Sequence, residues 1–265
     1  MRIFITLLAT LFATFASAKE DYGNVEYLDG WRLPDGSYQT AIVFNLEDGW
    51  KTYWRVPGPA GLPTTFNWTG SRNISDVVID WPAPYVFESY GLYSFGYKGQ
   101  VVLPVRIVPA DPEKPVSVDM RMEFGVCSDI CVPASARLQT TLDSNTAPEG
   151  KPLITKALTK TVQPLSKGGV SSVNCNLRPN PKGMDISAQL QFSGTPASEQ
   201  YVVMEYDNPD IWIDSAELQR EGRAVTASSR LEFYGSGILA LDRSKLRVTL
   251  LQGGKAYETT GCPAR

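Results

Sequence analysis

Two closely spaced cysteines carry the most reactive side chains of this sequence. Cys127 and Cys131 lie in the stretch FGVCSDICVP and make up half of the four cysteines of the chain. Two thiols at this spacing can form a structural disulfide, supply two ligands of a metal site, or act as a redox-active disulfide. The rest of the sequence has to decide among these three chemistries.

The chain must turn between these two cysteines if they form a disulfide. Four steps along a straight strand span about 13 Å, whereas the Cα atoms of a disulfide lie about 4.4–6.8 Å apart. The alternating residues before Cys127 are typical of a strand, and Ser128-Asp129 suits a turn. Pro133 keeps the returning strand out of a central position in a sheet. We therefore expect a β-hairpin whose tip is closed by its own disulfide.

A disulfide across so short a loop is a weak structural device. It removes little conformational entropy from the unfolded chain, and labile disulfides of this kind are the catalytic or regulatory ones. Asp129 between the cysteines raises the pKa of a nearby thiol, and no Lys or Arg lies between Glu123 and Arg137. We therefore expect a disulfide that a partner's thiolate attacks.

The composition excludes several other chemistries. The chain has no histidine, which rules out Ser-His-Asp triads, Cys-His proteases and His-ligated zinc or copper. Two thiolates suffice for Cu(I), but the five methionines form no Met-x-x-Met cluster. With a net charge of −3 and no basic stripe, nucleic acid is not an expected partner. We expect no cofactor and no metal.

The first eighteen residues, MRIFITLLATLFATFASA, have the organisation of a cleaved signal peptide. A basic residue precedes an apolar run, and Ala16-Ser17-Ala18 provides the cleavage site. The run is shorter than the roughly 20 residues that a membrane-spanning helix needs. We expect an exported protein without stable membrane insertion, in a compartment where disulfides persist.

Strand patterns predict two β-sandwich domains. Short alternating segments rich in β-branched and aromatic residues fill residues 19–145 and return from 170 to 265. Between them, residues 146–169 read as a linker in which 153–162 has helical spacing. The four cysteines allow three pairings, of which spacing favours Cys127–Cys131 and Cys175–Cys262. The second of these, which closes a long loop, is expected to be structural.

The first domain resembles the N-terminal periplasmic domain of the DsbD and ScsB thiol–disulfide reductases, in particular the ScsB branch. The resemblance is carried by DGWKTYWRVPGPAGLPTTFNW (48–68), WPAPYVFESYGLYSFGYKGQVVLPVRI (81–107) and GVCSDICVPASA (125–136). It implies an immunoglobulin-like sandwich with one redox disulfide. Together with the strand pattern, this gives an all-β fold of two immunoglobulin-like β-sandwich domains joined by a linker with a short helix.

The resemblance also implies a function and a role for each cysteine. Cys131, followed by Val132-Pro133, matches the cysteine that joins the partner, which leaves Cys127 as the resolving cysteine. The implied activity is that of a periplasmic protein-disulfide reductase, which relays electrons from a membrane electron-donor protein to exported thioredoxin-like oxidoreductases. Between residues 1 and 265 we find no counterpart of the family's transmembrane and thioredoxin-like domains, so we expect the electrons to come from a separate protein.

Further residues match the surroundings of the family's active site. Phe87, Glu88 and Tyr90 fall on its cap loop, although Ser89 replaces an aromatic shield, and Tyr53 matches a nearby aromatic. Ordinary core packing also explains these aromatic residues. The KTYWRVPGPAGLP stretch reads as a rigid loop that supports the sandwich rather than a ligand groove.

Two other functions stay open. The chain suits a non-catalytic β-sandwich binding module in which both disulfides are structural, and such a module would resist mild reductant. A Cu(I)-handling periplasmic protein is the third possibility, in which the reduced cysteine pair would bind copper stoichiometrically.

Overall fold

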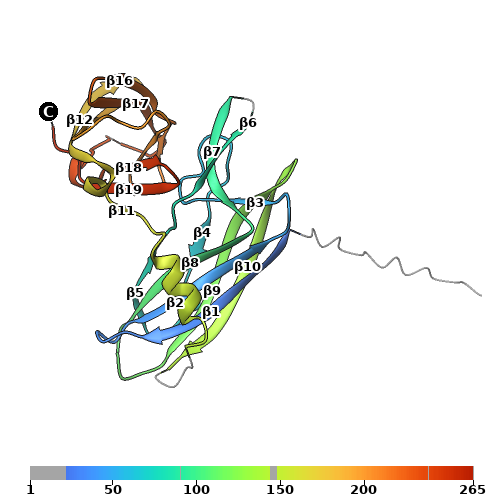
Figure 1. Ribbon diagram of the computed structural model, residues 1–265. Helices are drawn as coiled ribbons and strands as arrows, with labels where there is room; N and C mark the ends of the chain where they lie inside the picture. Colours follow the sequence, from blue (N-terminus) through green and yellow to red (C-terminus); the bar gives the residue numbers. More distant parts are fainter. Residues whose placement is uncertain (1–21, 90, 144–147, 238, 265) are drawn as a thin grey trace, which may run out of the picture.

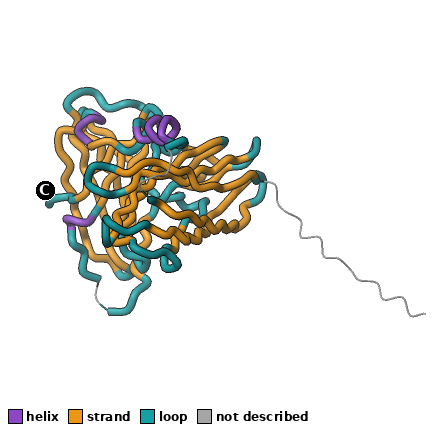
Figure 2. The backbone as a smooth tube through the Cα atoms, turned by 90° about the horizontal axis from the view of Figure 1, so that it is seen from below, coloured by secondary structure: helices purple, strands orange, loops and turns teal. Residues whose placement is uncertain are grey.

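The structure is a computed structural model that describes residues 22–89, 91–143, 148–237 and 239–264 (Figure 1). The expected signal peptide, residues 1–18, and Tyr90 lie outside these ranges. Strands dominate both domains, and helices are confined to short segments (Figure 2). The all-β class expected from the sequence is therefore confirmed. Within the described part of the chain, no helix is long and apolar enough to span a membrane.

The first domain is a sandwich of two sheets. One sheet has the order β1-β2-β8-β5 and contains β1 (Gly23–Arg32), β2 (Tyr38–Leu46), β8 (Gln100–Pro109) and β5 (Ile74–Ile79). The other has the order β10-β9-β3-β7-β6 and contains β10 (Cys131–Leu142), β9 (Val116–Cys127), β3 (Lys51–Tyr53), β7 (Leu92–Lys98) and β6 (Tyr85–Ser89), with β4 (Thr65–Asn67) paired to β9.

The core of this sandwich follows from strand alternation. Alternate residues of β2, β8 and β9 point inward, among them Phe44, Leu103, Met120 and Met122. Strand β2 is buried along almost its whole length because helix α1 (Lys151–Leu158) covers the outer face of its sheet. This helix, which falls in the expected linker, packs Ile154 and Ala157 against that face.

The second domain is a second sandwich. One sheet has the order β11-β19-β18-β14 and contains β11 (Gln163–Pro164), β19 (Lys255–Thr260), β18 (Arg247–Gln252) and β14 (Tyr201–Glu205). The other has the order β12-β13-β17-β15 and contains β12 (Val170–Asn180), β13 (Gly183–Phe192), β17 (Ala224–Phe233) and β15 (Ile211–Ile213), with β16 (Glu217–Glu221) paired to β17. Two short 3-10 helices, η1 (Leu165–Gly168) and η2 (Arg243–Lys245), complete the domain.

A buried disulfide holds the end of the chain in the second domain. Cys175 on β12 is bonded to Cys262, and both residues are only 1% exposed. The Cys175 amide also donates to the Pro263 carbonyl over 2.7 Å. Because the disulfide closes a separation of 87 residues, the chain-entropy account assigns it about 4–5 kcal/mol of stabilisation.

The two domains are packed together through side chains. Val203, Leu251 and Ala256 belong to the second domain but pack in the core cluster of the first. The sheet that carries β14, β18 and β19 is therefore covered on both faces, by the second core on one side and by the first domain on the other. Figure 1 shows the second domain, in orange to red, against one end of the first sandwich.

Candidate functional site

The Cys127–Cys131 disulfide closes the tip of the β9–β10 hairpin. The two strands pair without a register shift from Leu142 opposite Val116 to Cys131 opposite Cys127. The Cα atoms of the two cysteines are 4.1 Å apart, close to the narrow spacing of directly opposed antiparallel residues. Ser128 closes the turn by donating its amide to the Ile130 carbonyl over 3.2 Å. The hairpin expected from the sequence is present.

The two sulfurs have different surroundings. Cys127 is 1% exposed, whereas Cys131 is exposed. The difference follows from topology, because β10 is the outermost strand of its sheet and β9 lies one position inward. Pro133 sits on this outer strand, exposed and opposite Gly125, where its missing N–H is tolerated. An incoming thiolate therefore has access to the sulfur of Cys131.

The hydroxyl of Tyr53 contacts both sulfurs. It lies 2.7 Å from Cys127 Sγ and 3.3 Å from Cys131 Sγ, and it donates to the Ala60 carbonyl over 3.3 Å. A disulfide sulfur carries no hydrogen, so the hydroxyl is the donor to either sulfur, and its one hydrogen is shared among the three acceptors. Tyr53 is 1% exposed, and burial raises the pKa of its hydroxyl, so that the proton is retained at neutral pH.

A loop rich in proline and glycine covers the ring of Tyr53. The loop, residues 57–63, approaches so closely that a Cβ atom on Gly61 would lie 2.7 Å from the ring. A Cβ on Gly125 would lie 2.6 Å from the Cβ of Leu62 and 3.2 Å from the Tyr53 ring. These two glycines therefore let the loop and β9 pack directly against the tyrosine. The loop packs on the sandwich through Gly61 and Leu62, and Pro57, Gly58 and Pro63 of the same loop line a pocket, although the sequence favours a supporting loop over a ligand groove.

A lysine that no local sequence pattern indicates is paired across the sheet with the buried cysteine. Lys51 on β3 is directly opposite Cys127 on β9, and directly opposed side chains project from the same face of a sheet. Its ammonium is 5.1 Å from the centre of the Phe87 ring. Lys51 is thus the residue paired with Cys127, although no Lys or Arg lies between Glu123 and Arg137 in the sequence, and its ammonium extends toward β6.

The expected cap residues lie on a hairpin at the other edge of the sheet. Phe87 and Glu88 belong to β6, which pairs with β7, and both β7 and β3 lie between β6 and β9. Phe87 is half-buried and Glu88 is exposed. Phe87 is linked to the disulfide region through Lys51, whereas Tyr93 on β7 packs its ring 5.1 Å from that of Tyr201 in the second domain.

The tip of the cysteine hairpin exposes one acidic and one apolar side chain. Asp129 is exposed, and the neighbouring Ile130 is 73% exposed. Leu62, which packs beside Gly125, is 40% exposed. The disulfide is thus flanked by apolar side chains that a protein partner can cover. Among the residues that the structure describes, no group of three or more His, Cys, Asp or Glu side chains is placed to hold a metal ion.

Fold and site together define an all-β protein of two immunoglobulin-like sandwiches with a half-exposed disulfide at a hairpin tip. Residues 26–143 match the family described as "Thiol:disulfide interchange protein DsbD, N-terminal". The first domain therefore belongs to the DsbD N-terminal family, as the resemblance implied.

A solved structure has the same fold over nearly the whole chain. The N-terminal periplasmic domain of ScsB from Proteus mirabilis matches with a TM-score of 0.66 and 20% sequence identity. The match covers 91% of this chain and 92% of the ScsB chain, so both sandwich domains are shared. None of the curated proteins compared with the chain matches it significantly.

Proposed function

We propose that this chain is an exported thiol–disulfide interchange protein that relays electrons between protein partners through Cys127 and Cys131. The observation that carries the proposal is the asymmetry of the disulfide. One sulfur is exposed at the outer strand, and the other is buried beside the hydroxyl of Tyr53 and opposite Lys51. A structural disulfide does not need one sulfur that is accessible to a partner. Nor does it need a hydrogen-bond donor beside the sulfur that would leave during exchange.

The disulfide is reduced in two steps. A thiolate of a reduced donor attacks Cys131 Sγ, which breaks the Cys127–Cys131 bond and forms a mixed disulfide. Cys127 leaves as a thiolate, accepts the hydrogen bond of Tyr53 and is protonated from solvent. The second thiolate of the donor then attacks the donor's own sulfur in the mixed disulfide. This step releases Cys131 as a thiolate and leaves the donor oxidised by two electrons.

The two electrons are passed on by the reverse sequence. The Cys131 thiolate attacks the disulfide of an acceptor, one sulfur of the acceptor leaves, and a second mixed disulfide forms. Cys127 gives up its proton, and its thiolate attacks Cys131 Sγ and restores the intramolecular disulfide. The two acceptor sulfurs take up protons, so the acceptor is released as a dithiol. In this scheme Cys131 is the cysteine that joins each partner, and Cys127 is the resolving cysteine.

The family and the signal sequence support a periplasmic setting. The matching ScsB structure is itself described as a periplasmic domain. We propose thioredoxin-like exported oxidoreductases as acceptors and a separate membrane protein as the electron donor. Phe87 and Glu88 on the β6–β7 hairpin, and exposed Asp129 and Pro133, would border the partner's contact area.

The reduction potential of the Cys127–Cys131 pair tests the proposal. The protein is equilibrated with glutathione buffers, and thiols are trapped and located by mass spectrometry of the cysteine-containing peptides. We expect a potential of roughly −120 to −270 mV for this pair, with Cys175–Cys262 remaining oxidised as an internal reference. A value below about −300 mV would mark a structural bond and favour the non-catalytic binding module.

A further inference from the structure

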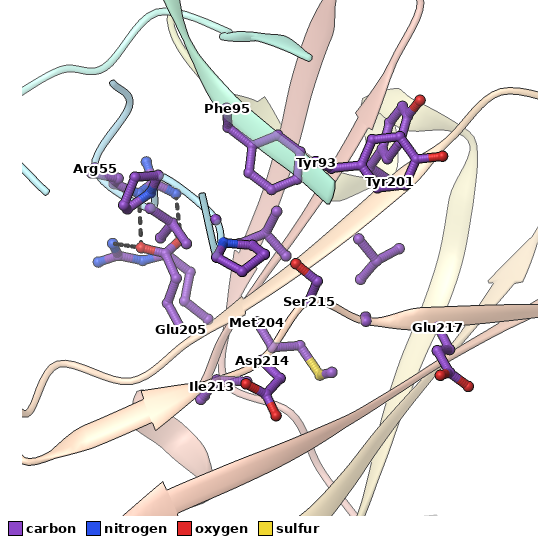
Figure 3. A pocket seen from close by; sticks show the side chains of 18 of the residues that line it. Arg55, Tyr93, Phe95, Tyr201, Met204, Glu205, Ile213, Asp214, Ser215 and Glu217 are labelled. Atoms are coloured by element: carbon purple, nitrogen blue, oxygen red, sulfur yellow. Dashed lines mark hydrogen bonds and ion pairs between the residues drawn. The ribbon is translucent and has the colours of Figure 1, made fainter. Parts of the chain in front are cut away.

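A large pocket lies between the two domains. Its volume is about 1010 Å³. The first domain contributes Arg55 and the start of the 57–63 loop, together with Tyr93 and Phe95 from β7. The second domain contributes residues 198–207 and 211–218, which include all of β14 and β15 (Figure 3). The pocket is not part of the disulfide site described above.

The second sandwich is open along the side that faces this pocket. β14 ends one of its sheets, since it pairs only with β18. β15 and β16 form the border of the other sheet, since each pairs only with β17. An edge strand directs the N–H and C=O of every second residue away from its partner. The edges of both sheets therefore border the same pocket, and the pocket lies where a further strand could pair with one of these edges.

Apolar side chains line the gap between the two sheet edges. Met204 on β14 is buried in the second core, and Ile213 and Leu218 pack against that core from the opposite edge. Trp212 is 40% exposed, and the rings of Tyr93 and Tyr201, which also line the pocket, pack edge to face. These side chains offer apolar contacts to alternate residues of an extended peptide.

The pocket has more acidic side chains than its ion pairs neutralise, and one of them, Asp214, accepts a hydrogen bond from Trp212 Nε1 over 2.9 Å. At one end Arg55 is neutralised by Glu205 and Glu258, and Arg247 bridges the same two carboxylates. The remaining acidic lining residues are Glu199, Asp207, Asp214 and Glu217, and none of them forms an ion pair within the described residues. Arg220 and Lys245 are the other lining cations, so the acidic groups outnumber them. A basic segment is the complementary ligand.

We propose that this pocket binds an extended segment of the redox partner, with alternating apolar and basic residues, which adds to β14 as a further strand. The identity of the partner rests on the proposed function. The 57–63 loop connects the two sites, since Pro57, Gly58 and Pro63 line the pocket while Gly61 packs on Tyr53. A segment held here keeps the partner at a high effective concentration beside Cys131.

A synthetic peptide tests the pocket without any thiol chemistry. The probe is a fluorescent seven-residue peptide that alternates valine and lysine, titrated into the full-length mature protein and followed by anisotropy. We expect saturable binding with a Kd below about 100 μM. The same peptide with glutamate in place of lysine is expected to bind at least tenfold more weakly. A peptide with N-methyl groups on alternate amides loses ladder hydrogen bonds and is expected to bind at least tenfold more weakly as well.

Matched variants locate the binding. Glu217→Lys, in the pocket, is expected to weaken binding at least tenfold, whereas Glu221→Lys on the same strand but outside the pocket leaves it unchanged. Trp212→Ala is expected to weaken binding, and Tyr234→Ala, an exposed aromatic outside the pocket, is its control. All four side chains are exposed, so folding is retained and can be verified by circular dichroism.

Three outcomes would overturn the proposal. They are the absence of saturable binding up to about 1 mM, equal effects of Glu217→Lys and Glu221→Lys, and full affinity of the N-methylated peptide, which would indicate a simple apolar ligand site. A self-association that Ser215→Arg abolishes would assign the pocket to a second copy of the chain. Because these titrations involve no thiol, their failure leaves the reduction potential of the cysteine pair as a separate test of the relay.

Discussion

At the scale of single residues, the two cysteines differ in exposure because they lie on neighbouring strands of one sheet, of which only β10 is at the edge. Cys131 is exposed on the outer strand and Cys127 is buried one strand inward. Residue types and spacing alone do not predict this difference in exposure, and only the family resemblance, through Val132-Pro133 after Cys131, distinguished the two cysteines. The sequence located the pair and its turn, but Lys51 and its place opposite Cys127 depend on pairing with β3, which no local pattern indicates.

The difference in exposure predicts different reactivity of the two thiols. In Cys127→Ser, the free thiol of Cys131 is accessible, whereas in Cys131→Ser the free thiol of Cys127 is buried beside the hydroxyl of Tyr53. We expect the thiol of Cys127→Ser to react at least tenfold faster with Ellman's reagent at neutral pH. Unfolding in guanidinium should equalise the two rates. Equal rates in the folded proteins would contradict the assignment of Cys131 as the attacked sulfur.

The hydroxyl of Tyr53 predicts an effect on the rate of reduction. Tyr53→Phe removes the donor that lies 2.7 Å from Cys127 Sγ and keeps the ring. A hydrogen bond to a charged group contributes about 1.5–3 kcal/mol, and we expect the smaller value for sulfur, so reduction by dithiothreitol should slow roughly tenfold. Tyr97→Phe, whose hydroxyl bonds the Pro82 carbonyl, is the control. An unchanged rate would show that the departing sulfur needs no donor.

Buried tyrosines also predict the behaviour of the first domain at alkaline pH. Desolvation by burial raises the pKa of Tyr27, Tyr53 and Tyr97 above the ordinary value of about 10. A tyrosine whose pKa is higher in the folded than in the unfolded state contributes stability that is fully present below its unfolded-state pKa of about 10. This stability is lost as the pH rises above that value. We expect the unfolding free energy from urea titrations to fall between pH 9.5 and 11. Absorbance at 295 nm should show these three side chains ionising at a higher pH in the folded protein than in the unfolded chain.

At the scale of secondary-structure elements, strands with clear alternation were predicted well and interrupted ones were not. Residues 38–46 and 100–108 have the strand pattern expected within 19–145, and they form β2 and most of β8. β1 was missed because Asp29 and Gly30 interrupt its pattern, where a bulge lies between Leu28 and Trp31. The family resemblance placed residues 87–91 on a cap loop, but Phe87, Glu88 and Ser89 lie on β6, which pairs with β7. Strands at the edge of a sheet can be irregular, and an irregular strand is hard to predict because its residues do not alternate clearly.

The close contact between β9 and the 57–63 loop predicts that adding one methyl group at Gly125 lowers the stability of the protein. Gly125→Ala places a Cβ 2.6 Å from that of Leu62, so the loop or Tyr53 must move. We expect the unfolding free energy to fall by about 1–3 kcal/mol, as for other overpacked sites, and reduction of the disulfide by dithiothreitol to change in rate. Gly194→Ala is the matched control, since a Cβ there meets no atom within 4 Å. Equal effects of both changes in urea titrations would contradict the packing argument.

At the scale of the whole molecule, the two domains are joined by a shared apolar contact and by one buried ion-pair network. Sequence patterns separated the domains at a linker, and they gave no sign that Val203, Leu251 and Ala256 complete the first core. Arg55 follows the buried Trp54, over whose ring its guanidinium lies at 4.3 Å, and reaches Glu205 and Glu258 in the second domain. Because these ion-pair partners lie far apart in the sequence, no local pattern indicates that they meet, and only the folded arrangement of both sandwiches shows it.

This network predicts that Arg55 couples the stability of the two domains. The side chains of Arg55 and Glu205 are each 14% exposed, so Arg55→Met leaves two largely buried carboxylates without their main partner. Breaking a buried pair costs about 3–5 kcal/mol, whereas the exposed Arg106–Asp35 pair contributes about 0–1 kcal/mol, which makes Arg106→Met the control. In urea titrations we expect the single transition of the native protein to become two transitions in Arg55→Met. Adding Glu205→Gln and Glu258→Gln should restore part of the loss, because the uncompensated charges are then removed. Equal losses in Arg55→Met and Arg106→Met would mean that apolar packing alone holds the domains together.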